Sequence, residues 1–328
     1  MTRGRYDAGY VMVSLADVRA AAERIQGFVV RTPLERCVDL SALCGVDVWL
    51  KFECFQATGS FKLRGALNAL LVLPDQARQR GVITASAGNH GLGVARAASL
   101  VGVPATVVVP ETASLAKVEA LRHSGAQLIL WGATYDHAEL EGRRLAHERG
   151  LWFISAYNDP AVVAGGGTIA LEVLDALPAV RTLLVPAGGG GLIGGVGVAA
   201  HGINPDIVVQ GAQSVASPAL HEALEAGTRV EVEVRPSLAD GLSGNVEKDS
   251  ITFDLLKRHV REVVLVEEGQ ITDAMRWLLA HEHVLVEGSG AVGVASLLAG
   301  TRPVAGPVAV VLSGRNVAAS VLQQYVLG

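Results

Sequence analysis

The sequence lacks long hydrophobic runs, an excess of charge and an apolar leader, and each absence excludes a class of protein. No stretch reaches the roughly 18 uninterrupted apolar residues that a membrane-spanning helix needs. The first residues, Met-Thr-Arg-Gly-Arg-Tyr-Asp, do not contain the apolar core of a signal peptide. The formal net charge of −5 offers no basic surface for nucleic acid or an anionic membrane. We therefore expect a cytoplasmic protein that acts on small molecules.

Cysteine is also scarce. The three cysteines, Cys37, Cys44 and Cys54, are odd in number, lie in one segment and have no Cys-x-x-Cys spacing, so we expect neither disulfides nor a structural zinc site. His281 and His283 are two residues apart and do not share a helical face, and no third ligand follows nearby. We therefore predict no metal at this pair.

Aromatic residues make up 5% of the chain, whereas half of it is hydrophobic and glycine occurs 38 times. This composition is typical of α/β sheets flanked by helices. A length of 328 residues corresponds to about two domains, each long enough to bury a core.

Strands and helices are predicted to alternate along the chain. A compact unit has predicted strands at 81–85, 105–109, 127–130 and 152–154, with helices starting near Asn89, Ser114 and Thr134. A second set has predicted helices at 14–26, 61–71 and 167–177, and strands at 46–52, 182–186, 207–211, 262–266 and 307–312. Such βα units form parallel sheets with right-handed crossovers.

The order of these segments predicts two domains, one split in sequence around the other. Residues 1–72 and 157–328 are expected to form a large domain, and residues 73–156 a small inserted domain. The cleft between them is the expected active site. The most loop-like stretch is 231–251, which is rich in charge, proline and glycine.

The run Gly59-Ser60-Phe61-Lys62 places an amine at the predicted start of the helix 61–71, one turn before further positive charge. A lysine that is partly desolvated and close to positive charge loses its proton more easily and becomes nucleophilic, which suits Schiff-base chemistry. A surface lysine at a helix start is the plain alternative.

Four consecutive glycines, Gly188–Gly191, follow an apolar strand and precede a helix. Their amides can converge on an anion at the helix N-terminus, which predicts a phosphate cradle. With Gly194 the run also fits the G-x-G-x-x-G pattern of dinucleotide-binding folds, so a nicotinamide dehydrogenase stays open. The next strand should then end near an acidic residue that binds the ribose, and Gln213 and Ser214 stand there instead. Close helix packing alone explains one or two glycines but not a run of four.

The segment Ser86-Ala87-Gly88-Asn89-His90 lies between a predicted strand and a helix, where α/β folds bind ligands. Its hydroxyl, amide and backbone N–H groups form an anion site that suits a substrate carboxylate. An ordinary Ser or Asn N-cap is the alternative.

The lysine run, Gly-Ser-Phe-Lys-Leu-Arg-Gly-Ala at 59–66, resembles the signature of the fold-type-II pyridoxal-phosphate enzymes, and within them the serine/threonine dehydratase and serine racemase branch. The resemblance extends from about residue 14 to the end. It implies a two-domain α/β fold like that of the tryptophan synthase beta chain, with parallel sheets and helices on both faces. It also implies pyridoxal phosphate carried by Lys62, and a homodimer or homotetramer.

The same resemblance implies two sets of site residues. The cofactor set is Phe61, Lys62, Asn89, Gly188, Gly189, Gly190, Gly191, Leu192, Glu287 and Ser313. The substrate-carboxylate set is Ser86, Ala87, Gly88, Asn89 and His90. For Glu287, a solvated helix-end carboxylate is an equally good reading.

Ser313 begins the run Ser313-Gly314-Arg315-Asn316. The resemblance implies that the Ser313 hydroxyl faces the pyridine nitrogen and leaves it neutral, which favours elimination over reactions that need a long-lived carbanion. The family usually has a second glycine where Arg315 stands. Because arginine does not readily take positive φ, either this backbone lies in an ordinary region or the loop differs.

Two departures from the family pattern are informative. Racemases of this branch carry a serine where this chain has Ala87, so reprotonation of the face opposite the lysine has no obvious donor. Cation-activated members carry carboxylates where this chain has Gln213 and Ala219, so we predict no divalent-cation site.

We therefore predict a pyridoxal-phosphate-dependent ammonia-lyase, which converts L-threonine or L-serine to a 2-oxo acid and ammonia. A dehydratase for a rarer hydroxyamino acid, such as an intermediate of hydroxyectoine breakdown, is an alternative. A non-catalytic carrier of pyridoxal phosphate and the nicotinamide dehydrogenase are two others.

Overall fold

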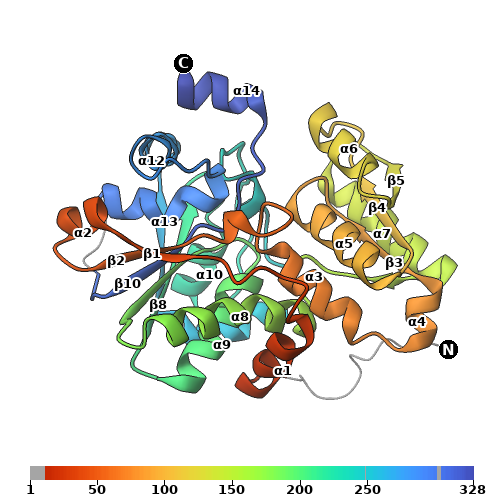
Figure 1. Cartoon of the computed structure of the whole chain (residues 1–328). Coiled ribbons are helices and arrows are strands. Elements are labelled where there is room, and N and C mark those ends of the chain that lie inside the picture. The colour runs from red at the N-terminus through yellow and green to blue at the C-terminus, as the bar shows by residue number, and fades with distance from the viewer. Residues whose placement is uncertain (1–11, 248, 301–303) are drawn as a thin grey trace.

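A computed structural model describes residues 12–247, 249–300 and 304–328, and these residues form two separate β-sheets with flanking helices (Figure 1). The larger sheet has six strands in the order β1-β2-β10-β7-β8-β9. Its strands are β1 (Leu34–Cys37), β2 (Val48–Lys51), β7 (Thr182–Pro186), β8 (Val208–Ser214), β9 (Glu262–Val266) and β10 (Val308–Val311). All neighbours are parallel except β1, which runs antiparallel to β2.

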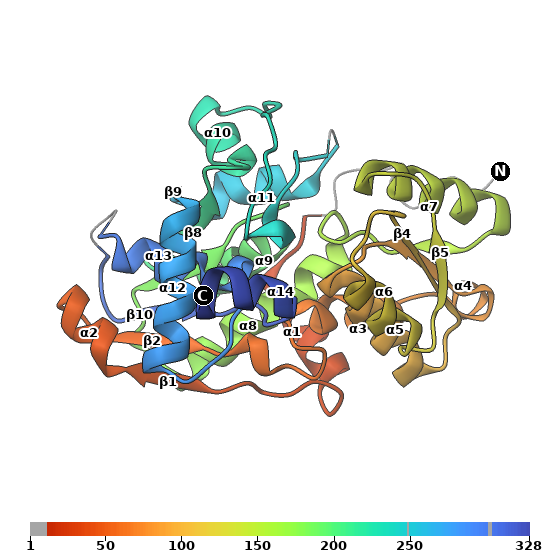
Figure 2. The same ribbon diagram turned by 90° about the horizontal axis from the view of Figure 1, so that it is seen from above.

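The smaller sheet has four parallel strands in the order β5-β4-β3-β6. Its strands are β3 (Val82–Ala85), β4 (Ala105–Val109), β5 (Gln127–Leu130) and β6 (Trp152–Phe153). Figure 2 shows this sheet and its helices beside the larger one.

The helices lie on both faces of each sheet (Figures 1 and 2). They are α1 (Leu15–Ile25), α2 (Val38–Cys44), α3 (Lys62–Leu71), α4 (Asp75–Arg80), α5 (Asn89–Val101), α6 (Leu115–Arg122), α7 (Tyr135–Arg149), α8 (Pro160–Ala176), α9 (Gly191–Ile203), α10 (Ala219–Ala226), α11 (Ile251–His259), α12 (Glu268–His281), α13 (Gly288–Leu298) and α14 (Ala319–Val321). Short 3₁₀ turns span Glu53–Phe55 and Asp240–Leu242, and a π-helical turn spans Leu322–Leu327.

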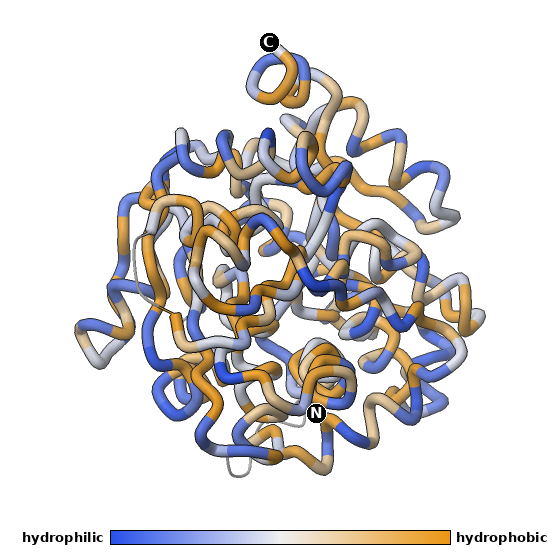
Figure 3. Tube along the Cα trace, turned by 60° about the vertical axis from the view of Figure 1, so that its left-hand side comes forward, coloured by the Kyte–Doolittle hydropathy of each residue, from blue (hydrophilic) through white to orange (hydrophobic). Residues whose placement is uncertain are grey.

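The larger sheet buries both of its faces, as parallel sheets do. Along β7, Leu183 and Val185 belong to a core formed with α1, α8, α9 and α11, whereas Leu184 belongs to a second core formed with α2, α12 and α13. The alternation follows from the two-residue period of a strand. Figure 3 shows hydrophilic and hydrophobic residues alternating along the outer helices, which is the pattern of helices with one face on a core.

The predicted fold class is confirmed, and the strands β4, β5, β7 and β9 have the predicted bounds. Ser14 caps α1 as expected, and with Asp17 it completes a capping box. Four predicted strands are one or two residues too long at one or both ends, namely those that correspond to β2, β3, β6 and β10. Strand β8 extends beyond the predicted 207–211, to Ser214, because it pairs with both β7 and β9.

The prediction of a helix at 167–177 is wrong at its start, because α8 begins at Pro160. Asp159 accepts hydrogen bonds from the N–H groups of Ala161 and Val162, and proline suits the first helical position. The glycines inside α8 do not break it, because neighbouring helices approach closely there. A Cβ on Gly165 would lie 2.6 Å from the carbonyl oxygen of Arg64 on α3.

The larger sheet takes β1 and β2 from before the smaller sheet in sequence and β7–β10 from after it. We propose that the two sheets mark two domains, with residues 73–156 inserted between 1–72 and 157–328. Within the described residues, no helix is both long and apolar enough to cross a membrane.

Candidate active site

The lysine segment is attached to the carboxyl end of the central strand β10. The Phe61 N–H donates to the Ser313 carbonyl at 3.0 Å, and the Arg315 N–H donates to the Gly59 carbonyl at 2.9 Å. Ser60 and Gly314 form an antiparallel bridge between these two bonds. Lys62 therefore lies at the edge of the sheet where α/β folds bind ligands.

Lys62 is the first residue of α3, with Phe61 as N-cap, so the helix begins one residue later than predicted. Its Nζ donates to the Ala156 carbonyl at 2.9 Å and lies 5.2 Å from the centroid of the Phe61 ring. Burial lowers the pKa of this amine to about 8, although the carboxylate of Glu287 opposes the change. A helix N-terminus also disfavours a cation. A sizeable fraction of the amine is therefore neutral near physiological pH, and the reading as a plain surface lysine is wrong.

The four-glycine run connects β7 to α9 and leaves no room for side chains. Gly190 has φ +88°, which favours glycine, and it is the N-cap of α9. A Cβ on Gly189 would overlap the ring of Tyr157, and one on Gly188 would lie 2.9 Å from the Cα of Leu242. The Thr252 hydroxyl donates to the Gly189 carbonyl at 2.7 Å, which fixes that peptide. The run is therefore closely packed, and among the described residues no side chain caps the first amides of α9.

The loop between β3 and α5 carries the predicted carboxylate set. The alternative of a Ser or Asn N-cap is wrong, because Gly88 is the N-cap and, among the residues described, no side chain caps α5. The Ser86 hydroxyl instead accepts from the Gly88 N–H at 3.2 Å. The amides at the start of α5 therefore have no competing cap, as an anion site requires.

His90, the second residue of α5, is buried next to Lys62. Its Nε2 lies 3.2 Å from the Ile154 carbonyl oxygen, and since a carbonyl can only accept, Nε2 is the protonated nitrogen that donates this hydrogen bond. Within the described part of the chain, its Nδ1 has no hydrogen-bond partner. Burial, together with the charge of Lys62, lowers the pKa of the ring to about 3, so His90 is neutral.

Glu287 is buried, so the alternative of a solvated helix-end carboxylate is wrong. Its Oε1 accepts from Asn89 Nδ2 at 2.6 Å, and the backbone N–H of Glu287 donates to the Gly314 carbonyl at 3.0 Å. Burial, with a smaller contribution from Asp240, raises the pKa of this carboxyl to about 7. The glutamate therefore joins the start of α5 to the loop after β10.

The loop after β10 keeps an ordinary backbone at Arg315. In the described residues, His283 is the one non-glycine with positive φ, so the first of the two predicted alternatives for Arg315 is correct. The Arg315 guanidinium lies 5.5 Å from the centroid of the Phe55 ring. Ser313 is buried, and so is Ser60, whose hydroxyl has no partner in the portion that the structure describes.

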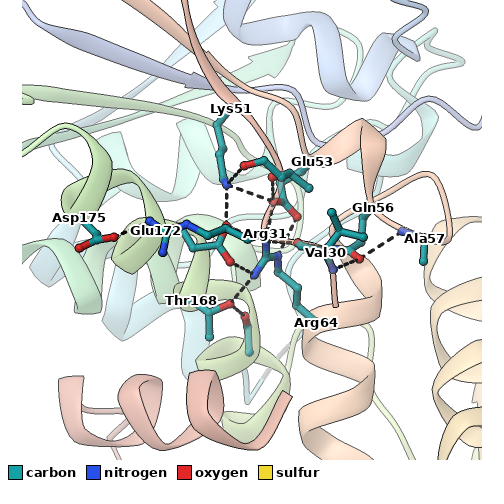
Figure 4. Close-up of polar contacts among 12 residues, drawn as sticks. Val30, Arg31, Lys51, Glu53, Gln56, Ala57, Arg64, Thr168, Glu172 and Asp175 are labelled. Atoms are coloured by element: carbon teal, nitrogen blue, oxygen red, sulfur yellow. Dashed lines mark hydrogen bonds and ion pairs between the residues drawn. The ribbon is translucent and has the colours of Figure 1, made fainter. Parts of the chain in front are cut away.

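Behind Lys62, a buried ion network holds the other side of α3 (Figure 4). Arg64 Nε bonds Glu53 Oε2 at 2.8 Å, and its Nη1 bonds Glu172 Oε1 at 2.7 Å. Lys51 Nζ bonds Glu172 Oε2 and the Thr32 carbonyl, both at 2.6 Å. Two cations and two anions thus neutralise one another, and they join β2, α3 and α8.

Several residues that contact the site were not predicted. Tyr157 and Leu242 pack against the glycine run, Thr252 binds its backbone, and Asn316 contacts Asn89. Two signals existed in the sequence. Tyr157 follows the last strand of the smaller sheet at its ligand-binding end, and Leu242 lies in the loop-like stretch 231–251.

These observations fit pyridoxal phosphate, which combines a phosphate with an aldehyde. The glycine run leads into a helix N-terminus that no described side chain caps, and side chains in place of the glycines would collide with their neighbours. The amine of Lys62, whose pKa is lowered, lies at the same edge of the sheet. The orphaned polar atoms of Ser60 and His90 leave hydrogen-bonding capacity at that edge, as counted over the described residues.

Comparison with known proteins agrees with this fit. Residues 25–314 match the family of pyridoxal-phosphate dependent enzymes. The chain belongs to this family. An L-threonine ammonia-lyase of Thermotoga maritima is 42% identical over 315 residues, which are 96% of this chain and 78% of the relative.

Two solved structures of this enzyme family are close in fold. Maize serine racemase has a TM-score of 0.91 and 34% identity, over 95% of this chain and 96% of the racemase. The processed form of threonine deaminase isoform 2 from Solanum lycopersicum has a TM-score of 0.87 and 32% identity, over 95% of this chain and 86% of the deaminase. Because both activities occur on this fold, the fold alone does not decide between them.

Gln213, which stands where cation-activated members of the family carry a carboxylate, caps a helix in this structure. Gln213 Oε1 accepts from the N–H groups of Leu220 and His221, both at 3.2 Å, at the start of α10. No group of three or more potential metal ligands occurs among the described residues. The three cysteines, which are in the described part, are free thiols.

Proposed function

We propose that this pyridoxal-phosphate-dependent enzyme is an ammonia-lyase that converts L-threonine or L-serine to a 2-oxo acid and ammonia. The observation that carries the proposal is the amine of Lys62, which burial brings to a pKa of about 8 at the first residue of α3. The relatives named as threonine ammonia-lyase and threonine deaminase support the choice of substrate. Family membership leaves the nicotinamide dehydrogenase without support.

We assign the cofactor set by what each residue offers. The amides of the run Gly188–Gly191 and of Leu192 at the start of α9 would bind the phosphate. Asn89 offers an amide to the ring oxygen, Ser313 a hydroxyl to the ring nitrogen, and Phe61 an apolar surface beside Lys62. When bound, the cofactor supplies the electron withdrawal that makes the substrate Cα–H acidic.

The protein moves the proton. Lys62, once its amine is free, takes the Cα proton as general base, a role that contributes on the order of 10² to 10⁴ in rate. Its pKa near neutrality matches this work, because the best bases have a pKa close to the working pH. The backbone N–H groups of Ala87, Asn89 and His90 would bind the substrate carboxylate, because the N–H of Ser86 donates to the Val108 carbonyl and that of Gly88 to the Ser86 hydroxyl. The neutral ring of His90 adds no charge there.

The hydroxyl of Ser313 favours elimination. A hydroxyl does not hold a proton on the ring nitrogen as a carboxylate would, so a carbanion at Cα is less stabilised and departure of the β-hydroxyl competes well. Glu287, which accepts a hydrogen bond from Asn89, has a pKa of about 7 and is therefore partly neutral near neutral pH.

Serine racemase is the second candidate, because the maize racemase has the same fold. Inverting a stereocentre needs a donor on the face opposite the lysine, and Ala87 has no proton to give. We expect essentially no D-serine from L-serine, and some racemisation in Ala87→Ser at the expense of elimination. Chiral chromatography of the products measures both. Substantial D-serine from the unmodified enzyme would favour the racemase.

A screen of hydroxyamino acids for 2-oxo acid release tests the proposal. We expect release from L-threonine, L-serine or both, together with ammonia. Release only from a rarer hydroxyamino acid would move the proposal to that substrate, as in hydroxyectoine breakdown. A protein that binds pyridoxal phosphate but releases no oxo acid from any of them would be a carrier.

We also infer that the enzyme is a homodimer or homotetramer, from its resemblance to this family. Light scattering of the purified protein checks this inference, and a mass near 34.1 kDa, that of one chain, would contradict it.

A further inference from the structure

Asn316, in the loop after β10, joins two segments that belong to the site. Its Nδ2 donates to the Thr58 carbonyl at 2.8 Å and to Asn89 Oδ1 at 2.6 Å. Thr58 precedes the lysine run, and Asn89 is the first residue of α5. A Cβ on Gly59 would lie 2.6 Å from Asn316 Oδ1, so a glycine there makes room for this amide.

The chain of contacts fixes the direction of every hydrogen bond in it. The Thr58 carbonyl can only accept, so the Asn316 atom beside it is the nitrogen. That nitrogen can only donate, so the Asn89 atom that it contacts is the oxygen. The opposite end of the Asn89 amide is therefore the nitrogen, and it donates to Glu287 Oε1 at 2.6 Å.

An amide nitrogen has two N–H groups, and Asn89 donates one of them to Glu287 in a hydrogen bond. We propose that Asn316 is a positioning residue, which fixes the amide of Asn89 so that its second N–H is presented to the ring oxygen of the bound cofactor. The inference rests on the proposed function, since it needs pyridoxal phosphate in the site. It assigns a role to a residue that lies outside the predicted cofactor set.

Loss of Asn316 would free the Asn89 amide to turn over. The turned amide would direct Oδ1, in place of an N–H, toward the ring oxygen, so that the lone pairs of two oxygens would face each other there. Asn316→Asp would favour this turn actively, because a carboxylate at that position can only accept and would draw Asn89 Nδ2 toward itself. Asn316→Ala would only remove the constraint.

The test is a pH titration of the absorbance of the bound cofactor in the holoenzyme. An N–H donor stabilises the anionic form of the ring oxygen, so losing it raises the pKa of the absorbance change, by about one unit for a charge-assisted bond. We expect Asn316→Asp to give the larger rise and Asn316→Ala a smaller one. Gln324→Glu adds the same charge on the exposed C-terminal turn and should leave the titration unchanged.

A double substitution separates positioning from a general structural role. Asn89→Ala removes the N–H itself, so it should give the largest rise. The pair Asn89→Ala with Asn316→Ala should titrate like Asn89→Ala alone, because Asn316 acts through Asn89. Additive shifts, or Asn316 variants that titrate like the unmodified enzyme, would overturn the inference and leave the proposed function standing. A protein with no cofactor absorbance at all would overturn both.

Discussion

The two sides of helix α3 differ in how their polar groups are satisfied. On one side, Arg64 and its partners Glu53, Glu172 and Lys51 form a closed network in which each charge meets an opposite charge within 4.0 Å. On the other side, Lys62 bonds only one carbonyl among the described residues, and its pKa is depressed.

The difference separates a structural site from a ligand site. Buried charges that neutralise one another fix the positions of the elements that carry them, and they need no ligand. Polar groups without partners are costly, and a ligand that bonds them recovers part of that cost. Near Lys62, the Ser60 hydroxyl and His90 Nδ1 are two such groups, as judged from the residues described.

The largest expected effect is on the ligand side. Lys62→Ala should abolish cofactor-dependent absorbance and lower turnover by on the order of 10³ or more, because it removes both the attachment point and the general base. The fold should persist, since the amine is not part of the core. Absorbance spectra measure cofactor binding, oxo-acid assays measure turnover, and circular dichroism measures whether the fold persists. A borohydride-stable adduct in the variant would show that another lysine holds the cofactor.

On the structural side, Arg64→Met should lower the free energy of unfolding by about 3–5 kcal/mol, because Glu53 and Glu172 keep their charges in a buried site. Urea denaturation measures the loss. Arg144, whose half-exposed side chain pairs with Glu141 and Glu148 within α7, is the control, and Arg144→Met should change stability much less. Equal effects of the two changes would contradict the distinction between the sites.

Gly189→Ala should weaken cofactor binding about 10- to 100-fold, because the new methyl group overlaps the Tyr157 ring and displaces one wall of the glycine run. Equilibrium titration of the apoenzyme with pyridoxal phosphate gives the dissociation constant. Gly269→Ala is the control, since a Cβ there meets nothing within 4 Å. An unchanged dissociation constant in Gly189→Ala would remove the glycine run from the phosphate site.

The rate of cofactor capture should rise about tenfold per pH unit up to pH 8 and then level off, because only the neutral amine reacts and the pKa of Lys62 is lowered to about 8. Stopped-flow absorbance measures the rate. Because the carboxylate of Glu287 raises that pKa, Glu287→Gln should move the plateau to lower pH. A rate that keeps rising past pH 10 would indicate an ordinary lysine.

The smallest expected effect is that of chelators. Gln213 Nε2 is buried without a partner, as judged within the described chain, yet an amide nitrogen is a hydrogen-bond donor and repels cations. Its oxygen already caps α10. EDTA should therefore leave activity unchanged. Loss of activity that magnesium or calcium restores would contradict this prediction and show that the enzyme needs a divalent cation.

The sequence by itself predicted the fold class and most strands, and it singled out segments that the structure places next to Lys62. Local patterns are sufficient for these features, because apolar alternation defines a strand and a run of glycines permits close approach of the backbone. Lys62, Asn89, Glu287 and Ser313 all carried a local motif. The start of α8 was also encoded locally, by the N-cap Asp159 and by Pro160 at the first helical position. The prediction placed the start later because glycines at 165–167 disfavour a helix.

Only the tertiary structure decided which distant residues complete the site and in what state they are. Asn316 contacts Asn89 across 227 positions of sequence, and Tyr157 covers the glycine run from another loop. The pKa values of Lys62 and Glu287 are likewise set by burial, which depends on every element packed around them. A motif names a side chain and its neighbours in sequence, whereas its partners and its protonation depend on contacts that form only when the chain is folded.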